Sequence, residues 1–418
     1  MTETAPVPPT LRRVLGLPLL VFYGVGVTVG AGIFALIGEI TRVAGDHAPL
    51  AFLLAGLIAG ATGISYALLA AVYPRAAGEA VFVKIGLGAV PGRLVGLTIA
   101  ATALASSAVI ALAFAGYLAA VAPVPVPVAT VGIVALLALV AWAGVRESVA
   151  LAAIVTVLEV ATLVVVAIAG APLLADAEIL ARVLTPPADP AALSAVAAAA
   201  LIAFFAFIGF EDIENMAEET VDPRYVMPRA ILLTLAITVA IYAALALIAV
   251  ALPDREGLTA SAAPLAFLFE QVSGRSGAPI AAMASIAMVN GILVQIVMAS
   301  RVLYGMAREG LVPAGLGVLD PRRRTPARAI ALVAVLIAGL ALFLPIVNLA
   351  QAASALVLCV FTTVNVSLWR IGGRVDADPS LRLWRWWGML GAILSVGLLL
   401  AEGARLAGLD GPGGTIVH

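Results

Sequence analysis

Residues 24–34 read Gly-Val-Gly-Val-Thr-Val-Gly-Ala-Gly-Ile-Phe and lie inside the first long apolar run of the chain. Five of these eleven residues are Gly or Thr, which are poor helix formers. A helix break inside lipid is tolerated only where the freed backbone faces protein, a cavity or a ligand. Freed N–H groups at the start of a resumed helix attract anions, so the stretch predicts a carboxylate receptor. Close helix packing through Gly26 and Gly30 is the alternative interpretation.

The composition indicates a membrane protein. Hydrophobic residues make up 63% of the chain and charged residues 11%. The mean hydropathy of +1.15 exceeds that of soluble domains of this length. We therefore expect a polytopic protein surrounded by the lipid bilayer. A net charge of −1 without a basic block gives no indication of nucleic-acid binding.

Few residues suit catalysis or metal binding. His47 and His418 are the only histidines, and Cys359 is the only cysteine. A zinc cluster or a serine–histidine hydrolase is therefore hard to build. No nucleophile or phosphate-binding loop stands at a usable spacing, so we expect no enzyme, no metal and no cofactor.

Eleven apolar runs are long enough to cross a bilayer, which takes about 20 residues. With the N-terminus inside, eighteen of the 23 Lys and Arg residues lie on the cytoplasmic side, as the positive-inside rule requires. We predict a multi-pass protein of the bacterial cytoplasmic membrane, with a cytoplasmic N-terminus and a retained first span. The runs cover residues 15–40, 48–73, 93–121, 126–145, 149–174, 191–217, 228–252, 277–306, 327–346, 349–370 and 384–406.

Three connecting segments are also informative. Residues 79–87, on the inside, and 261–272, on the outside, carry weak helical patterns and are expected to lie in the interface or over the pathway. Residues 175–190 contain several acids and prolines and read as an ordinary exterior loop.

The sixth run contains a second interruption, because Gly209 is followed by acids well before a helix would reach water. Glu211 lies roughly midway through a 30 Å apolar core. An ionisable residue at that depth costs about 2.5–3.5 kcal/mol and should face a cavity or a partner. On an α-helix, Glu211, Asn215 and Glu218 share one face. The directions of Asp212 and Glu214 stay open.

Runs one and six lie five runs apart, and each contains an interruption. Such a pair indicates an inverted-repeat transporter with a site near the membrane midplane. We predict one membrane domain over residues 1–418, with repeats at 15–174 and 191–370 and an extra helix at 384–406. Glu159 in run five has apolar neighbours. It is either a proton carrier or a protonated acid in one fixed hydrogen bond.

Several stretches along the chain together match the pattern of a known family. They are residues 26–34, 74–79, 144–148, 204–219, 222–223, 228–229 and 301–310. Through them the chain resembles the amino acid–polyamine–organocation superfamily, and especially its bacterial proton-coupled amino acid permeases and cationic amino acid transporters. The resemblance implies an all-α, LeuT-type fold of two inverted five-helix repeats, with spans one and six broken around the substrate.

The resemblance also implies roles for individual residues. The substrate carboxylate is expected at the amides of the Gly-rich break, and the α-amino group at carbonyls of span six. Phe205 is expected to close over the substrate, and Glu211 stands where a carboxyl is proton-sensitive in acid-resistance exchangers. The expected substrate-binding residues are Thr28, Gly30, Ala31, Gly32, Phe205, Phe207, Ile208 and Phe210, and those expected to couple protons are Glu159 and Glu211.

The chain departs from its relatives in three ways. Some proton-coupled relatives carry a Lys in span five where this chain has Glu159. The pattern after Pro74 has Ala77 and Ala80 where many relatives have Gly and Tyr. Most relatives have twelve spans rather than eleven, and the sequence does not indicate the oligomeric state.

These features favour a secondary transporter that moves amino acids with protons by alternating access. The alternatives are an amine or polyamine carrier, which the several acids of spans five and six suit, and an amino acid exchanger. A sodium-coupled carrier that uses Ser285 ranks lower, because paired hydroxyls are lacking there. A channel would need repeated pore-lining rings, which two unlike broken helices do not suggest.

Overall fold

A computed structural model describes residues 13–74, 78–144, 149–308, 310 and 312–407 of the chain. Parts of three stretches on which the resemblance rests, residues 75–77, 145–148 and 309, lie outside the described residues. The described part is helical, without a β-strand. The all-α, polytopic class expected from the sequence is thereby confirmed.

Short interruptions divide the helices into α-helical and 3₁₀ segments. The α-helices are α1 Leu17–Thr28, α2 Ala31–Ala44, α3 Ala48–Val72, α4 Gly78–Leu87, α5 Ala89–Ala119, α6 Val126–Ala143, α7 Val149–Gly170, α8 Ala177–Leu184, α9 Pro190–Phe204, α10 Pro223–Ala251, α11 Arg255–Ala260, α12 Pro264–Ser273, α13 Ala278–Arg308, α14 Ala327–Phe343, α15 Ile346–Gly372 and α16 Pro379–Leu406. The 3₁₀ segments are η1 Gly45–His47, η2 Ala171–Ala175, η3 Phe205–Phe207, η4 Phe210–Glu219 and η5 Ala314–Gly317.

Each of the eleven predicted runs corresponds to a helix or to a pair of helices in this order. Among the described residues, nine helical stretches are long and apolar enough to cross a membrane, and α1 and α14 are shorter apolar helices. Run one is divided between α1 and α2, and run six between α9, η3 and η4. The prediction of interruptions in these two runs is therefore borne out by the backbone.

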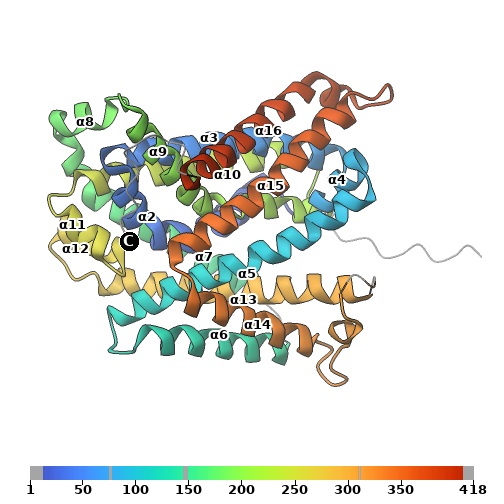
Figure 1. The fold of residues 1–418 in the computed structure, drawn as a ribbon, viewed down its shortest axis with the longest axis horizontal. Coiled ribbons are helices and arrows are strands. Elements are labelled where there is room, and N and C mark those ends of the chain that lie inside the picture. The colour runs from blue at the N-terminus through green and yellow to red at the C-terminus, as the bar shows by residue number, and fades with distance from the viewer. Residues whose placement is uncertain (1–12, 75–77, 145–148, 309, 311, 408–418) are drawn as a thin grey trace, which may run out of the picture.

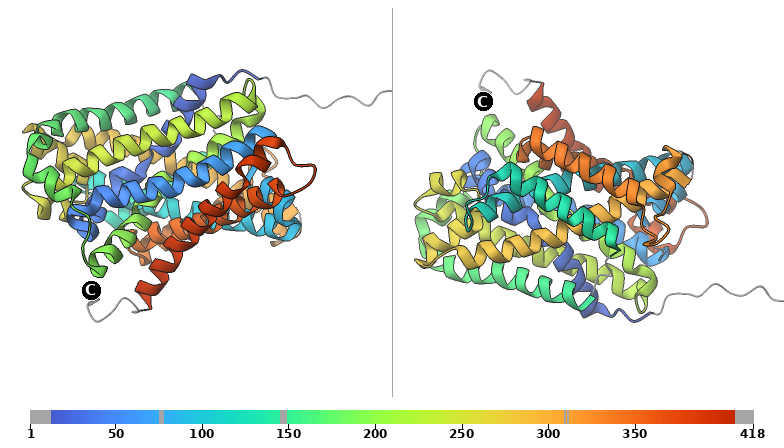
Figure 2. Two further views of the ribbon diagram at one scale, coloured as in Figure 1. Left: turned by 90° about the horizontal axis from the view of Figure 1, so that it is seen from above. Right: turned by 90° about the horizontal axis from the view of Figure 1, so that it is seen from below.

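Figure 1 shows α5, α6, α13 and α14 as one group of long helices, with the α15–α16 hairpin running obliquely beside them. On the other side of the molecule, α10 packs along α3, as the turned views of Figure 2 also show. The broken elements lie between these groups, because α1 contacts α10 while α2 contacts α5 and α13. The interruptions are thus surrounded by protein, as unpaired backbone inside a bilayer requires.

The connecting segments agree only in part with expectation. The inner and outer helical patterns correspond to α4 and α12. Residues 175–190, expected to be a plain loop, instead contain α8. Asp176 caps this helix by accepting a hydrogen bond from the Glu178 N–H at 2.9 Å, a local N-cap that outweighs the nearby prolines.

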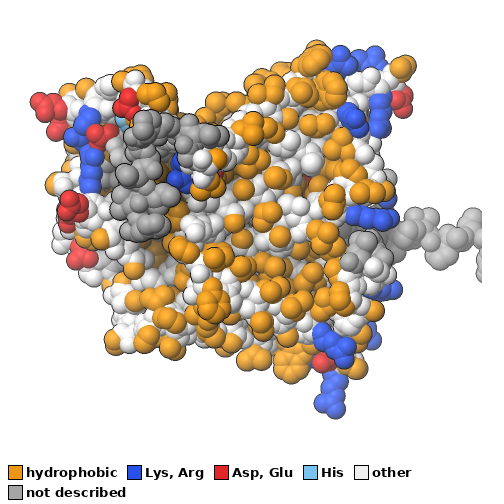
Figure 3. Space-filling model, viewed as in Figure 1, with side chains coloured by type: hydrophobic (Ala, Val, Ile, Leu, Met, Phe, Trp, Pro, Cys, Tyr) orange, Lys and Arg blue, Asp and Glu red, His pale blue; other side chains and the backbone are white. Residues whose placement is uncertain are grey.

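Charge is unevenly distributed over the surface (Figure 3). Lys and Arg side chains gather at the right-hand end of the view, around the turn between α15 and α16, whereas acidic side chains gather at the opposite end. Apolar side chains cover the surface between the two ends. This distribution is typical of a protein whose apolar belt lies in a bilayer.

Candidate substrate site at two helix breaks

The first break lies between Thr28, where α1 ends, and Ala31, where α2 begins. Gly30 precedes α2 with φ −59° and ψ −158°, outside the helical region. The first N–H groups of α2 have no partner within their own helix, because a helix begins with four unpaired donors. Ala31 and Gly32 are buried and Gly30 is partly buried. The predicted anion-binding amides therefore exist as the start of a helix inside the protein.

The glycines of this stretch have different roles. A Cβ atom on Gly26 would lie 2.1 Å from Oγ1 of Thr156 in α7, and one on Gly32 would lie 2.6 Å from Cα of Ala206 in η3. At Gly30 the nearest atom would be the Val27 carbonyl oxygen at 3.6 Å. Gly26 and Gly32 thus allow close packing, whereas Gly30 marks the break, so the packing expected at Gly26 and Gly30 is found at Gly26 alone of these two.

The second break separates η3 from η4 at Ile208 and Gly209. Gly209 has φ +122°, a region that favours glycine. A Cβ there would approach the Val27 carbonyl oxygen to 2.7 Å, so the two breaks are in contact. The Gly209 N–H donates to Oε2 of Glu211 at 2.8 Å. The carboxyl of Glu211, only 6% exposed, thereby satisfies a backbone donor at the break.

Tyr242 of α10 connects the two breaks, and the sequence analysis did not single it out. Its hydroxyl lies 3.0 Å from the Thr28 carbonyl oxygen and 2.9 Å from the Ala206 carbonyl oxygen. One phenolic proton serves both acceptors. The available sequence signal was a tyrosine in the middle of an apolar span, because a buried hydroxyl requires a partner.

The predicted aromatic residues point in different directions from span six. Phe207 packs edge-on against Tyr242, with ring centroids 5.2 Å apart. Phe210 instead packs against Tyr66 and Phe361, at 5.8 and 5.3 Å. Phe205 is buried and Ile208 is partly buried. The backbone of this segment therefore borders the first break, while its aromatic rings anchor it to neighbouring helices.

Two predicted hydroxyl groups are engaged within their own helices. The Thr28 hydroxyl donates to the Gly24 carbonyl oxygen at 2.7 Å, and the Ser285 hydroxyl donates to that of Ala281 at 2.9 Å. Thr28 still borders the site, because its carbonyl oxygen accepts from Tyr242.

Glu159 lies on α7 close to the same breaks. It is 4% exposed, and its carboxyl interacts electrostatically with the Tyr242 hydroxyl. Thr156, one turn earlier, faces Gly26 of α1. Among the described residues, no basic side chain forms an ion pair with Glu159. The two candidate proton carriers thus lie on different elements that contact α1, Glu159 on α7 and Glu211 on η4.

The prediction that Glu211, Asn215 and Glu218 share one face of span six is wrong. Residues 210–219 form the 3₁₀ helix η4 rather than an α-helix, and side chains three apart therefore align. Glu211 and Glu214 share the buried face, with Glu214 completely buried. Asn215 and Glu218, expected on the same face as Glu211, are only partly buried.

Glu214 connects span six to the helix α4. Its Oε1 accepts a hydrogen bond from the Glu79 N–H at 3.4 Å, at the start of α4. The Tyr66 hydroxyl donates to Oε1 of Glu79 at 3.2 Å. Burial, and secondarily the charge of Asp212, raises the pKa of Glu79 to about 8. Tyr66 was not singled out from the sequence, and the contact of Glu79 with Glu214, whose direction was left open, was not predicted, because α4 meets η4 only in the folded chain.

The start of span one, before α1, and the end of span six, after η4, are joined through their backbones. The N–H groups of Val14 and Leu15 donate to the Glu219 carbonyl oxygen at 2.9 and 3.0 Å. The Val221 N–H donates to the Leu15 carbonyl oxygen at 2.9 Å. The segment before α1 and the segment after η4 therefore form one short bridge.

Known proteins resemble the chain over nearly its whole length. A sequence model described as amino acid permease matches residues 15–403. An uncharacterized transporter of Mycobacterium tuberculosis is 33% identical, over 96% of this chain and 91% of that protein. A branched-chain amino acid permease of Lactococcus lactis is 27% identical, over 85% and 81%. A vacuolar cationic amino acid transporter of Arabidopsis thaliana is 30% identical, over 86% and 63%. The match to the amino acid permease model includes both breaks.

Proposed function

This chain belongs to the amino acid permease family, and from that premise we propose that it moves amino acids together with protons by alternating access. Family membership makes it a membrane transporter rather than an enzyme. The observation that carries the proposal is the pair of breaks in contact at Val27 and Gly209, with two buried carboxyls, Glu211 on η4 and Glu159 on α7, on elements that contact α1.

The two breaks suit the two charges of an amino acid. Unpaired N–H groups at the start of α2 favour a carboxylate. Carbonyl oxygens around Phe207 and Ile208, together with Glu211, favour an ammonium group. We therefore assign the carboxylate to Gly30, Ala31 and Gly32, and the α-amino group to Phe207, Ile208 and Phe210. Phe205 and Thr28 complete the proposed contacts.

Proton coupling is assigned to Glu159 and Glu211. Both are buried in spans that contact the breaks, and among the described residues neither forms an ion pair with a basic side chain. A buried carboxyl with no cation nearby is more stable in its protonated, neutral form. Sodium coupling has less support, because the sequence around Ser285 lacks the paired hydroxyl groups that a sodium site usually shows.

The proposed setting is the cytoplasmic membrane, with the N-terminus inside. Support comes from the clustering of Lys and Arg at one end of the molecule (Figure 3). The bridge between Leu15 and Thr220 would then lie on the cytoplasmic side. It would make the inner halves of spans one and six move together during alternating access.

An amine or polyamine carrier is the second candidate. The observation that favours it is the number of buried acids on η4 and α7, which exceed what one α-amino group needs. Against it stands the first break, because a simple amine has no carboxylate to occupy the amides of α2. The named relatives include permeases for branched-chain and for cationic amino acids, so both classes belong in the test.

The test is uptake into proteoliposomes of labelled leucine, lysine and putrescine, under an imposed pH or sodium gradient. Wild type is compared with Glu159→Gln and Glu211→Gln. Glu402→Gln is the matched control, since Glu402 is a buried acid on α16 that accepts a hydrogen bond from Gln351 and forms an ion pair with Arg405, away from the breaks.

We expect amino acid uptake that follows the pH gradient and loses this dependence in one of the two site variants, while counter-exchange persists. Uptake of putrescine alone would replace the amino acid assignment by the amine carrier. Uptake driven only by sodium, or unchanged proton dependence in both variants, would overturn the proposed coupling.

A further inference from the structure

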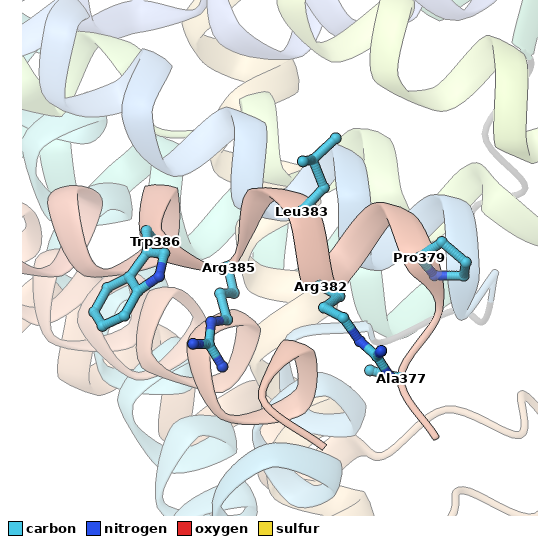
Figure 4. A pocket seen from close by; sticks show the side chains of 6 residues that line it. All are labelled: Ala377, Pro379, Arg382, Leu383, Arg385 and Trp386. Carbon is cyan, nitrogen blue, oxygen red and sulfur yellow. The ribbon is translucent and has the colours of Figure 1, made fainter. Parts of the chain in front are cut away.

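A cleft of about 660 Å³ opens at the start of α16, next to the turn that joins α15 to α16 (Figure 4). It lies away from the two breaks. Figure 4 shows the side chains of Arg382 and Arg385 leaving the same side of α16, with Trp386 beside them. The residues that line it are Ala377, Pro379, Arg382, Leu383, Arg385 and Trp386.

The positive charge in the cleft is not neutralised by the described acids. Arg385 is partly buried, and its guanidinium lies 5.1 Å from the Trp386 ring centroid. Among the described residues it has no ion pair with a carboxylate. Arg382 donates only to the carbonyl oxygens of Arg374 and Val375. A half-buried guanidinium without an acid partner favours an anion, which its planar donors bind well.

Asp378, which lies between the lining residues Ala377 and Pro379, is already engaged. Asp378 accepts from Arg224 at 3.2 Å and from both the N–H and the hydroxyl of Ser380. These contacts lower the pKa of Asp378, the hydrogen bonds of Ser380 most of all. Asp378 therefore stays ionised and directed toward α10 and its own helix, and it leaves the guanidinium groups of the cleft to another anion.

The position of the cleft along the membrane normal fits a lipid headgroup. Four of the five tryptophans of the chain, Trp369, Trp384, Trp386 and Trp387, lie at this end of α15 and α16. Tryptophan is enriched where the bilayer meets water. The cleft is thus expected at the depth of the lipid headgroups, with its arginines toward the aqueous phase.

An apolar stripe leads from the cleft along α16. Leu383 is 76% exposed, Ile393 61% and Leu400 67%. Together with Trp386 and Leu390 they recur every three to seven residues and so follow one face of the helix. This face suits an acyl chain, whereas a free inorganic anion would have no use for it.

We propose that the cleft binds one anionic phospholipid, with its phosphate between Arg382 and Arg385 and an acyl chain along Leu390 and Ile393. Arg385 supplies the forked donors, and the Trp386 ring covers the glycerol region. The site does not depend on the transported substrate or on proton coupling.

The experiment is native mass spectrometry of the purified, delipidated full chain, titrated with phosphatidylglycerol or with phosphatidylcholine of the same acyl chains. We expect one tightly held phosphatidylglycerol and weaker phosphatidylcholine. Arg385→Gln should weaken phosphatidylglycerol binding about fivefold, and the double variant with Arg382→Gln further. Arg323→Gln is the charge-matched control, because Arg323 lies over Trp142 at another place.

Arg385→Lys keeps the positive charge and controls for a folding defect. It should bind phosphatidylglycerol more tightly than Arg385→Gln does, while the two variants elute identically on size exclusion. Glycerol phosphate alone should not compete for the site. Equal phosphatidylglycerol binding by wild type and Arg385→Gln would overturn the proposal. So would equal binding of the two lipids, full competition by glycerol phosphate, or a dimer that persists without lipid and covers α16.

Discussion

The breaks of spans one and six differ in what they expose. The first is two residues long, Val29 and Gly30, and is followed by the apolar helix α2. The second begins with η3, turns at Gly209 and continues into the acidic η4. The first therefore offers N–H groups near apolar side chains, and the second offers carbonyl oxygens and carboxyls. Two unlike breaks in contact can sort the opposite charges of one zwitterion, which two identical breaks could not do.

The largest effect is expected for Gly209→Ala. The positive φ at this residue and the 2.7 Å approach to the Val27 carbonyl oxygen leave no room for a Cβ. Strain of this kind costs on the order of 1–3 kcal/mol from the backbone alone. We expect loss of uptake and a lower unfolding temperature in detergent. Gly132→Ala, with nothing within 4 Å, is the control. Wild-type uptake in Gly209→Ala would show that the breaks need not touch.

The glycines of the first break should respond unequally. Gly32→Ala would push Cβ to 2.6 Å from Cα of Ala206, so the breaks must separate. Gly30→Ala meets nothing closer than 3.6 Å and requires no positive φ. We expect Gly32→Ala to reduce the rate of uptake at least tenfold and Gly30→Ala to change it less than threefold, measured at equal amounts of protein. The reverse order would contradict the assignment of close packing to Gly32.

Tyr242→Phe tests the link between the breaks. It removes the hydroxyl that serves the Thr28 and Ala206 carbonyl oxygens, at a cost of about 1–2 kcal/mol. Tyr117→Phe is the matched control, because that buried hydroxyl donates to the Phe34 carbonyl oxygen away from the breaks. Both variants should lose similar stability, but only Tyr242→Phe should change the apparent KM for substrate. Equal KM values in the two variants would reduce Tyr242 to a packing residue.

The smallest effect concerns the contact between α4 and η4. The pKa of Glu79 is raised from 4.5 to about 8, so the folded protein holds this proton more tightly than the unfolded chain. Stability should therefore fall as pH rises between these values. Glu79→Gln removes this contribution and should flatten the decline of stability between pH 4.5 and about 8. The unfolding temperatures of wild type and Glu79→Gln, recorded from pH 5 to 9, measure this decline. Parallel curves for the two proteins would refute the prediction.

Much of the architecture followed from the sequence because lipid imposes simple rules. The apolar runs matched the helices, and the interruptions of runs one and six were found at Gly30 and Gly209. The α8 helix was missed, because one capping aspartate decided the conformation of a segment rich in proline. The division into two inverted repeats stays a prediction, as do the substrate contacts.

The site itself was less accessible to sequence reasoning. The α-helical spacing assumed for Glu211, Asn215 and Glu218 was wrong, since η4 has a period of three and buries Glu214 instead. Tyr242 and Glu79 lie far from the breaks in sequence and meet them only through packing of α10 and α4. No periodicity within one span reports such a partner.

The sequence by itself determined that this chain spans a membrane, where its helices lie and which two of them break. The physical reason is that apolar length, glycine and proline act locally, and a bilayer permits few other conformations. Only the tertiary structure decided that the breaks touch, that Tyr242 joins them and that Glu211 accepts a hydrogen bond from the second break. Those contacts depend on distances between spans, which are set by close packing at positions such as Gly26 and Gly32.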